Sequence, residues 1–359
     1  MTIAGRRTAG QGGLMRRILA GAGLALLLAL PAAGREPVRD ERITTALEQG
    51  LRPTYLSRNE PLPRWSLADR MAALGIPGVA IAVLRDGEVV HAEGFGVLSA
   101  GSAEPVTADT LFSVGSISKV VTSAILLRLT GEGSLDIDRD VNSYLTSWRL
   151  PTAPGGGPAV TLRMIMSHTA GLTVGGFDDF QPGERLPTLV QILDGVPPAK
   201  NPPIRLRREP GLLGDYSGGG TMVAQAVIED VTATGLEQVA QTRVFGPLGM
   251  RRSTFASPLP DGTPNVAKAH DGKGSPTALP RGWQSFPEQA ASGLWTSADD
   301  LGRFIGALLK SYRGRGDFLP QPVAVEMMTE VAPSWHGLGP RLEGEGLARV
   351  FHHGGSNDD

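Results

Sequence analysis

The spacing of hydrophobic positions along the chain changes twice. Between residues 79 and 97, small and β-branched residues alternate on both sides of Asp86-Gly87, a dipeptide typical of a two-residue hairpin turn. From about residue 117 to 250 the apolar positions recur at helical spacing, and each run closes at or near a glycine. The predicted helices are SKVVTSAILLRLTGEG, VTLRMIMSHTAGL, TMVAQAVIEDVTATG and LEQVAQTRVFGPLGM. A further helix, SADDLGRFIGALLKSY, and two strands in GLGPRLEGEGLARVFHHGG complete the pattern.

Strands at both ends and helices between them predict a sheet subdomain interrupted by an all-helical one. We place the sheet subdomain at residues 76–115 and 290–359 and the helical subdomain at 116–289. The predicted fold class is α+β, an α/β sandwich with an antiparallel sheet. Residues 35–75 form a lead segment rich in proline and arginine, whose one periodic piece is a short helix from about Leu67 to Leu74.

The first 34 residues have the pattern of a signal peptide. Four arginines precede the apolar run ILAGAGLALLLALPAAG, whose small terminal residues suit cleavage near Ala33 or Gly34. The run is short for a stable membrane span. We therefore expect a periplasmic or secreted protein, with an uncleaved membrane anchor as the alternative.

Composition removes several classes of chemistry. The chain has 359 residues, of which 41% are hydrophobic, enough for a sizeable core in one large domain or two average ones. Cysteine is absent, which excludes disulfides, thiolate nucleophiles and cysteine-ligated metals. The six histidines lack a metal-binding spacing, and the net charge of -2 gives no basic footprint for nucleic acid. We expect no metal, no cofactor and no nucleic-acid partner.

The stretch FSVGSISK places a serine and a lysine at the start of the most apolar helix. Ser116 and Lys119 are three positions apart, so they share one face of the helix, with Cβ atoms about 5–6 Å apart. Burial lowers the pKa of a lysine, and the neutral amine can take the proton of a serine hydroxyl. The positive end of the helix dipole favours negative charge at Ser116. The pattern therefore indicates an activated serine nucleophile.

A serine followed by lysine at this spacing occurs by chance about once or twice in a chain of this length, so the context decides its meaning. Here the pair is unique in the sequence, and its lysine faces a predicted core, where lysine is rare. The sequence contains no G-x-S-x-G elbow, so an α/β-hydrolase has no candidate serine. We interpret His168, in MSHTAGL, as a structural residue rather than a catalytic base.

Several phrases in a fixed order resemble one known family. They are IPGVAIAVLRDGEVV, TADTLFSVGSISK, MSHTAGL, PGLLGDYSGGG, FGPLGM, ASGLWTSADDLGRF and HHGGSN. Over roughly residues 65 to 357 the chain thereby resembles the serine β-lactamase and penicillin-binding protein superfamily, especially class C β-lactamases, D-alanyl-D-alanine carboxypeptidases and related esterases. The resemblance implies a β-lactamase/transpeptidase-like fold.

The resemblance also implies roles for single residues. Ser116 matches the acylated nucleophile of the family, and Lys119 matches its partner. Tyr216, in DYSGGG, matches the tyrosine of the second motif, which works in proton transfer. That motif usually ends in asparagine, whereas Gly218 stands here and removes a side-chain amide that would contact the substrate.

The third motif of the family, usually Lys-Thr-Gly, corresponds to His353-Gly354-Gly355. By analogy, the N–H groups of Ser356 and Ser116 would form the oxyanion hole, and Gly355 would line the cleft. Histidine can be neutral near pH 7, whereas lysine at this place holds a substrate carboxylate with a fixed charge. Gly218 and His353 together favour small esters or amides as substrates.

We predict an exported serine hydrolase that forms an acyl-enzyme with an ester, a β-lactam or a D-Ala-D-Ala peptide. Its partner is then a small-molecule or peptidoglycan-like substrate, and the sequence predicts no oligomeric state. A non-catalytic penicillin- or peptidoglycan-binding protein and an inactive, truncated product are the alternatives. The chain stops at Asp359, where the family continues with two strands and a helix, so we expect the strand Arg349 to Gly355 to lack its ladder partner.

Overall fold

The computed structural model describes residues 39–53, 61–151, 158–345 and 349–357. The predicted signal segment, residues 1–34, lies outside these ranges. Within them, no helix is both long enough and apolar enough to cross a membrane.

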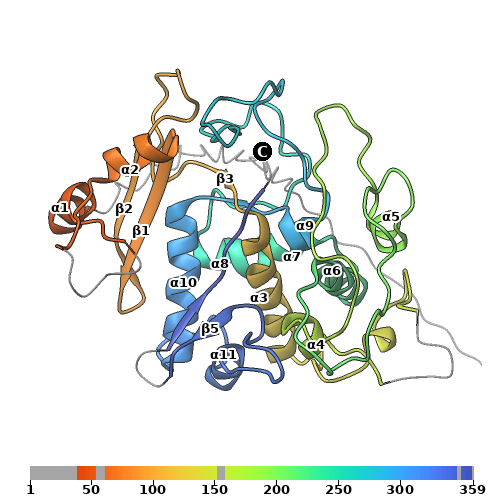
Figure 1. The fold of residues 1–359 in the computed structure, drawn as a ribbon. Helices are drawn as coiled ribbons and strands as arrows, with labels where there is room; N and C mark the ends of the chain where they lie inside the picture. Colours follow the sequence, from red (N-terminus) through yellow and green to blue (C-terminus); the bar gives the residue numbers. More distant parts are fainter. Residues whose placement is uncertain (1–38, 54–60, 152–157, 346–348, 358–359) are drawn as a thin grey trace, which may run out of the picture. The chain divides into compact units, whose positions relative to one another are not determined.

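The predicted hairpin is confirmed by strands β1 (Gly78–Arg85) and β2 (Glu88–Gly96), which pair antiparallel. Asp86 and Gly87 form the turn with φ values of 55° and 83°, the left-handed pair that a tight hairpin needs. The hairpin packs on helix α10 (Ala298–Tyr312), beside it in Figure 1. Gly302 of α10 allows the close approach, because a methyl group there would lie 2.9 Å from a methyl carbon of Val89.

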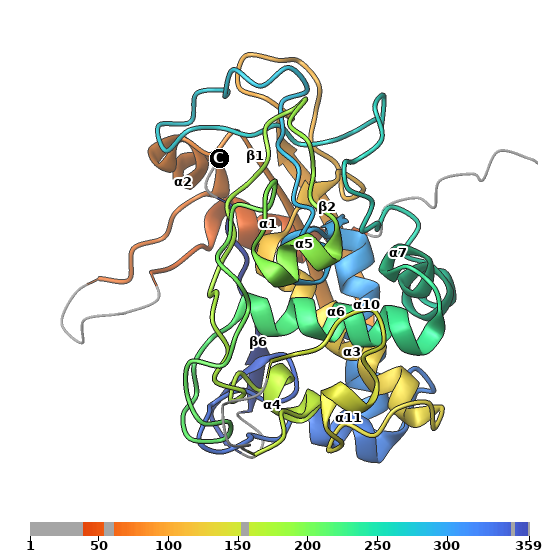
Figure 2. The same ribbon diagram turned by 90° about the vertical axis from the view of Figure 1, so that its right-hand side faces the viewer.

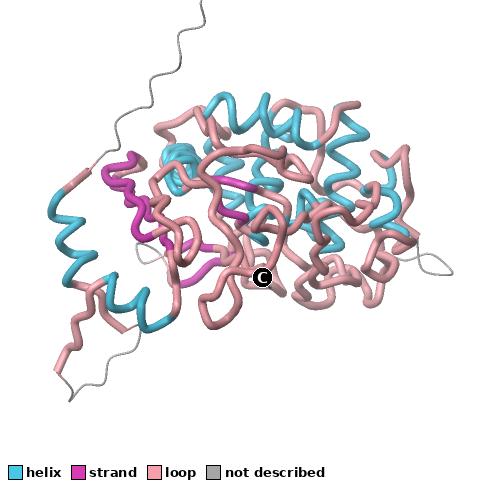
Figure 3. Tube along the Cα trace, turned by 90° about the horizontal axis from the view of Figure 1, so that it is seen from above, coloured by secondary structure: helices cyan, strands magenta, loops and turns pink. Residues whose placement is uncertain are grey.

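The described strands form three separate antiparallel pairs. Besides the hairpin, β3 (Phe112–Ser113) pairs with β4 (Trp295–Thr296), and β5 (Arg341–Glu343) pairs with β6 (Val350–His352). The last pair corrects one expectation: the strand within Arg349–Gly355 has a ladder partner, β5, on one edge. Figure 3 shows these short strands among predominantly helical and loop segments, as an α+β fold requires.

The core is built around helix α3 (Ser118–Gly131), in which eleven residues are buried, so that almost every side of the helix is covered. Helix α6 (Gly218–Thr232) and the short α9 (Gln289–Ser292) pack against it, and apolar residues of α10 join the same hydrophobic cluster. Figure 1 shows α3 with α10 on one side and α6 on the other, and in the turned view of Figure 2 the three helices overlap. The other helices are α1 (Glu41–Gln49), α2 (Leu67–Leu74), α4 (Leu162–Met166), α5 (Leu189–Asp194), α7 (Leu236–Ala240), α8 (Gly246–Leu248) and α11 (Gln321–Met327).

Local chemistry explains where prediction and structure differ. Helix α4 stops at Met166, short of the predicted MSHTAGL extension, because His168 adopts a left-handed φ of 60°. Ser297 caps α10 as predicted, accepting the N–H of Asp300 at 3.2 Å. The Asp300 carboxylate turns instead to the N–H of Arg252, 2.8 Å away. Helix α1, in the lead segment, was not predicted.

Candidate active site

Ser116 lies in a single 3-10 turn, η1 (Gly115–Ile117), that leads directly into α3. Gly115 takes a left-handed φ of 50°, which glycine adopts without strain and which turns the chain from β3 into the helix. Ser118 fixes this turn by donating to the Gly115 carbonyl at 2.6 Å and accepting the N–H of Leu294 at 3.0 Å. The start of the apolar helix therefore holds the Ser116 hydroxyl in place.

Lys119 points at Ser116, as the three-residue spacing predicts. Its Nζ lies 2.9 Å from the Ser116 Oγ and 2.8 Å from the carbonyl oxygen of Ala291, in α9. The side chain is only 4% exposed. Burial lowers the pKa of Lys119 to about 7, so that near neutral pH a large fraction of the protein molecules carries Lys119 as a free amine.

Tyr216 stands two residues before α6, whose N-cap is Ser217. Burial raises the pKa of the Tyr216 phenol, and a hydrogen bond with the Ser116 side chain opposes that shift. The Lys119 Nζ lies 5.1 Å from the centre of the Tyr216 ring. The structure therefore brings Ser116, Lys119 and Tyr216 together, with the tyrosine as a neutral phenol.

His168 holds the backbone on both sides of Tyr216. Its carbonyl accepts the N–H of Asp215 at 2.7 Å, and its Nδ1 accepts the N–H of Ser217 at 3.3 Å. The two ring centres of His168 and Tyr216 are 4.3 Å apart. Burial, together with the neighbouring His336 and Lys119 charges, keeps the pKa of His168 well below its usual range. These contacts fit the predicted structural role.

His336 was missed by the sequence analysis. It is buried, its ring centre lies 4.9 Å from that of His168, and its Nδ1 is 2.9 Å from the Ser334 Oγ. Burial lowers its pKa to about 4. Its place beside the tyrosine depends on the loop before β5, and no sequence motif marks it.

The segment after β6 returns to the nucleophile. A methyl group at Gly115 would lie 3.0 Å from the Ser356 nitrogen, and any side chain at Gly355 would collide with the Val114 carbonyl. Asn357 fixes the segment to β3, because its Nδ2 donates to the Ser113 Oγ at 2.7 Å. Gly355 and Ser356 thus lie against the turn that carries Ser116, the arrangement that the proposed oxyanion hole requires.

His353 also faces the site. Its ring centre lies 6.3 Å from that of Tyr216, and its Nδ1 donates to the Gly354 carbonyl at 2.6 Å. Burial lowers the pKa of His353 to about 4, with Lys119 and Arg341 acting in the same direction. This imidazole is therefore neutral near pH 7.

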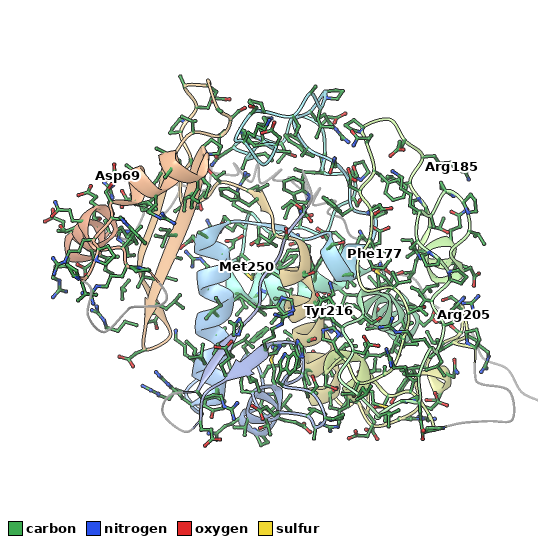
Figure 4. All side chains as sticks on the ribbon, in the orientation of Figure 1. Asp69, Phe177, Arg185, Arg205, Tyr216 and Met250 are labelled. Atoms are coloured by element: carbon green, nitrogen blue, oxygen red, sulfur yellow. The ribbon has the colours of Figure 1, made fainter. Side chains whose placement is uncertain are left out.

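Gly218 begins α6 beside Phe177, a second residue that the sequence analysis missed. A methyl group at Gly218 would lie 2.9 Å from Cε2 of Phe177 and 3.0 Å from the Gly175 carbonyl. Figure 4 labels Phe177 and Tyr216, which lie close together beside α6 and α9. The phenyl ring of Phe177 occupies the space that a side chain at position 218 would fill, which makes this side of the site apolar.

No group of three or more histidine, aspartate or glutamate residues in the described ranges has the arrangement of a metal site. The chemistry available here is that of a serine hydroxyl, an amine, a phenol and backbone N–H groups.

Comparisons with known proteins show which family and which fold the chain shares. The sequence model of the family described as Beta-lactamase matches residues 66–358. Esterase EstB of Burkholderia gladioli is 28% identical over 75% of this chain and 73% of its own length. A D-aminopeptidase of Gluconobacter oxydans is 29% identical, and this match spans 52% of the chain but only 34% of that enzyme. The structure of a D-amino acid amidase from Ochrobactrum anthropi aligns with a TM-score of 0.64 at 23% identity, over 80% of this chain and 81% of that one.

Proposed function

This chain belongs to the beta-lactamase family and is a serine hydrolase, and we propose that it cleaves small carboxylic esters through an acyl-enzyme on Ser116. One observation carries the proposal: the buried amine of Lys119, with a pKa of about 7, lies 2.9 Å from the Ser116 Oγ. We favour an ester over the other candidate substrates because the esterase EstB is similar to this chain over most of the length of both proteins.

In the first step the Ser116 Oγ attacks the carbonyl carbon of the ester, and its proton moves to the Lys119 Nζ. The Lys119 Nζ lies within hydrogen-bond distance of both the Ala291 carbonyl and the Ser116 Oγ, so that in its neutral form it can donate to the carbonyl and accept the hydroxyl proton. The N–H groups of Ser116 and Ser356 would then stabilise the oxyanion, and such a donor is typically worth about 10²–10³ in rate.

Collapse of the tetrahedral intermediate breaks the bond to the leaving alkoxide, which must receive a proton. We assign this transfer to Tyr216, whose phenol is hydrogen-bonded to Ser116 and is re-protonated from the Lys119 ammonium. Water then attacks the acyl-enzyme, gives its proton to the same groups, and releases the carboxylic acid and free Ser116.

Two features of the site favour an ester over a peptide with a terminal carboxylate. His353 is neutral near pH 7, so it supplies no fixed charge for a carboxylate. The Phe177 ring presents an apolar surface beside Gly218, where the asparagine usual in the family motif would place a polar side chain. β-Lactams and D-Ala-D-Ala peptides are accordingly the secondary candidates.

We also propose that the protein is exported, because residues 1–34 carry the pattern of a signal peptide. Mass spectrometry of protein recovered from outside the cytoplasm should give an N-terminus near Gly34 or Arg35. Recovery of the intact N-terminus from the cytoplasm alone would contradict export.

Acylation can be tested without knowledge of the natural substrate. Intact-mass spectrometry after exposure to a fluorophosphonate, and separately to a penicillin, should show one adduct on the protein and none on Ser116→Ala. Peptide mapping should place the adduct on residues 112–119. A folded protein that stays unlabelled, or an adduct that persists in Ser116→Ala, would overturn the proposal.

A further inference from the structure

Tyr216 depends on other segments for the placement of its side chain. It lies in irregular chain between Gly214 and the N-cap Ser217, so no helix or strand of its own fixes the direction of the phenol. A general acid must lie within hydrogen-bond reach of the atom that it protonates, and an error of about 1 Å can cost about a hundredfold in rate. The residues packed around the phenol therefore decide how well it acts on a leaving group.

His168 holds the tyrosine segment from an unusual backbone conformation. Its φ of 60° is left-handed, which is uncommon for residues other than glycine and persists only where the surrounding structure enforces it. Here the His168 N–H donates to the Ile165 carbonyl at 3.2 Å, and the next N–H, of Thr169, donates to the Met164 carbonyl at 2.8 Å. From this position the His168 ring reaches the ring of Tyr216, with 4.3 Å between the two centres.

His336 contacts the His168 imidazole from another side. The ring centres of His168, Tyr216 and His336 form a triangle with sides of 4.3 Å from His168 to Tyr216, 4.9 Å from His168 to His336, and 6.5 Å from Tyr216 to His336. The two imidazole planes are inclined at 79°, so one ring meets the other edge-on, a favourable arrangement for aromatic pairs. His336 therefore limits how far the His168 ring can turn away from the phenol.

The position of His336 is fixed by the loop between α11 and β5. Its Nδ1 lies 2.9 Å from the Ser334 Oγ, which also accepts the His336 N–H at 3.1 Å. The loop is joined to the end of α4, because the Gly339 N–H donates to the Met166 carbonyl at 3.1 Å. It also touches the tyrosine segment, since a methyl group at Gly214 would lie 3.2 Å from the Ser334 Cα. The loop therefore contacts both segments whose rings it supports.

The two imidazoles act by contact rather than by charge. Burial lowers the pKa of His336 to about 4 and keeps the pKa of His168 well below its usual range, so both rings are neutral near pH 7. Among the described residues, no hydrogen bond joins either ring to the Tyr216 hydroxyl. Removal of the His336 ring thus changes the packing behind the phenol and leaves the charge of the site as it was.

We infer that His336 is a positioning residue, which through its contact with His168 holds Tyr216 in the orientation that protonates the leaving alkoxide. The inference rests on the proposed function, in which Tyr216 gives that proton. In this step the bond between the acyl carbon and the leaving oxygen breaks while the phenol proton moves to that oxygen. Loss of His336 should therefore slow only those reactions whose leaving group needs a proton.

Two acetate esters separate this role from a general loss of structure. The p-nitrophenolate anion is stable near pH 7 and leaves without a proton, whereas the butoxide of butyl acetate must receive one. Both esters form the same acetyl-enzyme on Ser116, so their kcat/KM values differ only through binding and acylation. His336→Ala should lower kcat/KM at least about tenfold for butyl acetate, and about twofold or less for p-nitrophenyl acetate.

His91→Ala is the matched control, because His91 is an equally buried histidine in β2 that contacts Asp40 and Glu93 instead. It should change both esters by the same factor. Tyr216→Phe should show the selective loss in full, about a hundredfold for butyl acetate. Since His336 acts through Tyr216, adding His336→Ala to Tyr216→Phe should cause no further loss with butyl acetate.

His336→Asn keeps the inference testable if His336→Ala does not fold, because its amide can still bond the Ser334 Oγ while the ring edge is lost. It should show the same selective loss. Equal losses for both esters in the folded variant, or losses that add fully to those of Tyr216→Phe, would overturn the inference while the acyl-enzyme stands. Equal losses in Tyr216→Phe would remove that residue as the acid and the inference with it. Failure to cleave any ester, with Ser116 unlabelled, would instead remove the proposed function.

Discussion

Replacing Lys119 by methionine is expected to lower kcat/KM for p-nitrophenyl butyrate by about a thousandfold, within the range of general-base catalysis. Methionine fills a similar volume but cannot accept the proton of Ser116, whose Oγ lies 2.9 Å from the lysine Nζ. The loss should fall mainly on kcat, because the amine acts on the nucleophile and touches no remote part of the substrate. Lys273→Met, at an exposed position, should keep the wild-type rate.

The pH dependence of the same reaction gives an independent check. A lysine with a pKa of about 7 is mostly ammonium below that pH and mostly amine above it. Since the amine is the active form, kcat/KM should rise as the pH increases and reach half of its plateau near pH 7. A rate that is level from pH 5 to 9, or a Lys119→Met protein that loses less than tenfold, would show that another group takes the proton.

The sequence analysis succeeded where chemistry depends on local spacing. Ser116, in η1, and Lys119, in the first turn of α3, are three residues apart along a continuous helical segment, so the local backbone enforces their contact. The Asp86-Gly87 turn is equally local, because its two residues alone set the left-handed angles that define the hairpin. The position of Tyr216 was supplied by the family resemblance, since it depends on how α6 packs against α3.

Residues brought in by loops could not be predicted in the same way. Phe177 and His336 reach the site from segments without helical or strand periodicity, so no pattern in the sequence marks them. The short ladder of β5 and β6 forms by pairing across the loop that follows Glu343. The expectation that the last strand would be unpaired did not consider this pairing. The division into two subdomains stays a prediction.

Glu288 is a buried carboxyl that the reaction scheme does not use. It immediately precedes α9, its side chain is 1% exposed, and its Oε2 has no hydrogen-bond partner among the described residues. Burial raises the pKa of Glu288 from 4.5 to about 8; Lys200 opposes the shift, and the nearby Asp178 and Asp179 add to it. The carboxyl is therefore mostly protonated at pH 7 in the folded protein and ionised in the unfolded chain.

The difference between these two states makes the folding stability fall with pH. Between pH 4.5 and about 8 the folded protein binds a proton that the unfolded chain has lost, so the free energy of unfolding decreases as the pH rises. At 1.36 kcal/mol for each pKa unit, the decrease amounts to roughly 5 kcal/mol across that window. Lys119 acts in the opposite sense above pH 7, because its pKa is lowered on folding. The pH dependence of the whole protein therefore mixes both groups, and only a variant separates them.

Glu288→Gln should remove this decrease, because glutamine has the shape of the protonated carboxyl and does not ionise. We expect the variant to be close to the wild type in stability at pH 4.5, and more stable by roughly 3–5 kcal/mol at pH 8 to 9. Reversible urea unfolding, followed by tryptophan fluorescence at several pH values, measures the difference. Glu209→Gln, at an exposed glutamate, should show no such pH-dependent difference. A stability difference between Glu288→Gln and the wild type that is the same at every pH would mean that Glu288 is already ionised in the folded protein, and that water or a cation satisfies its Oε2.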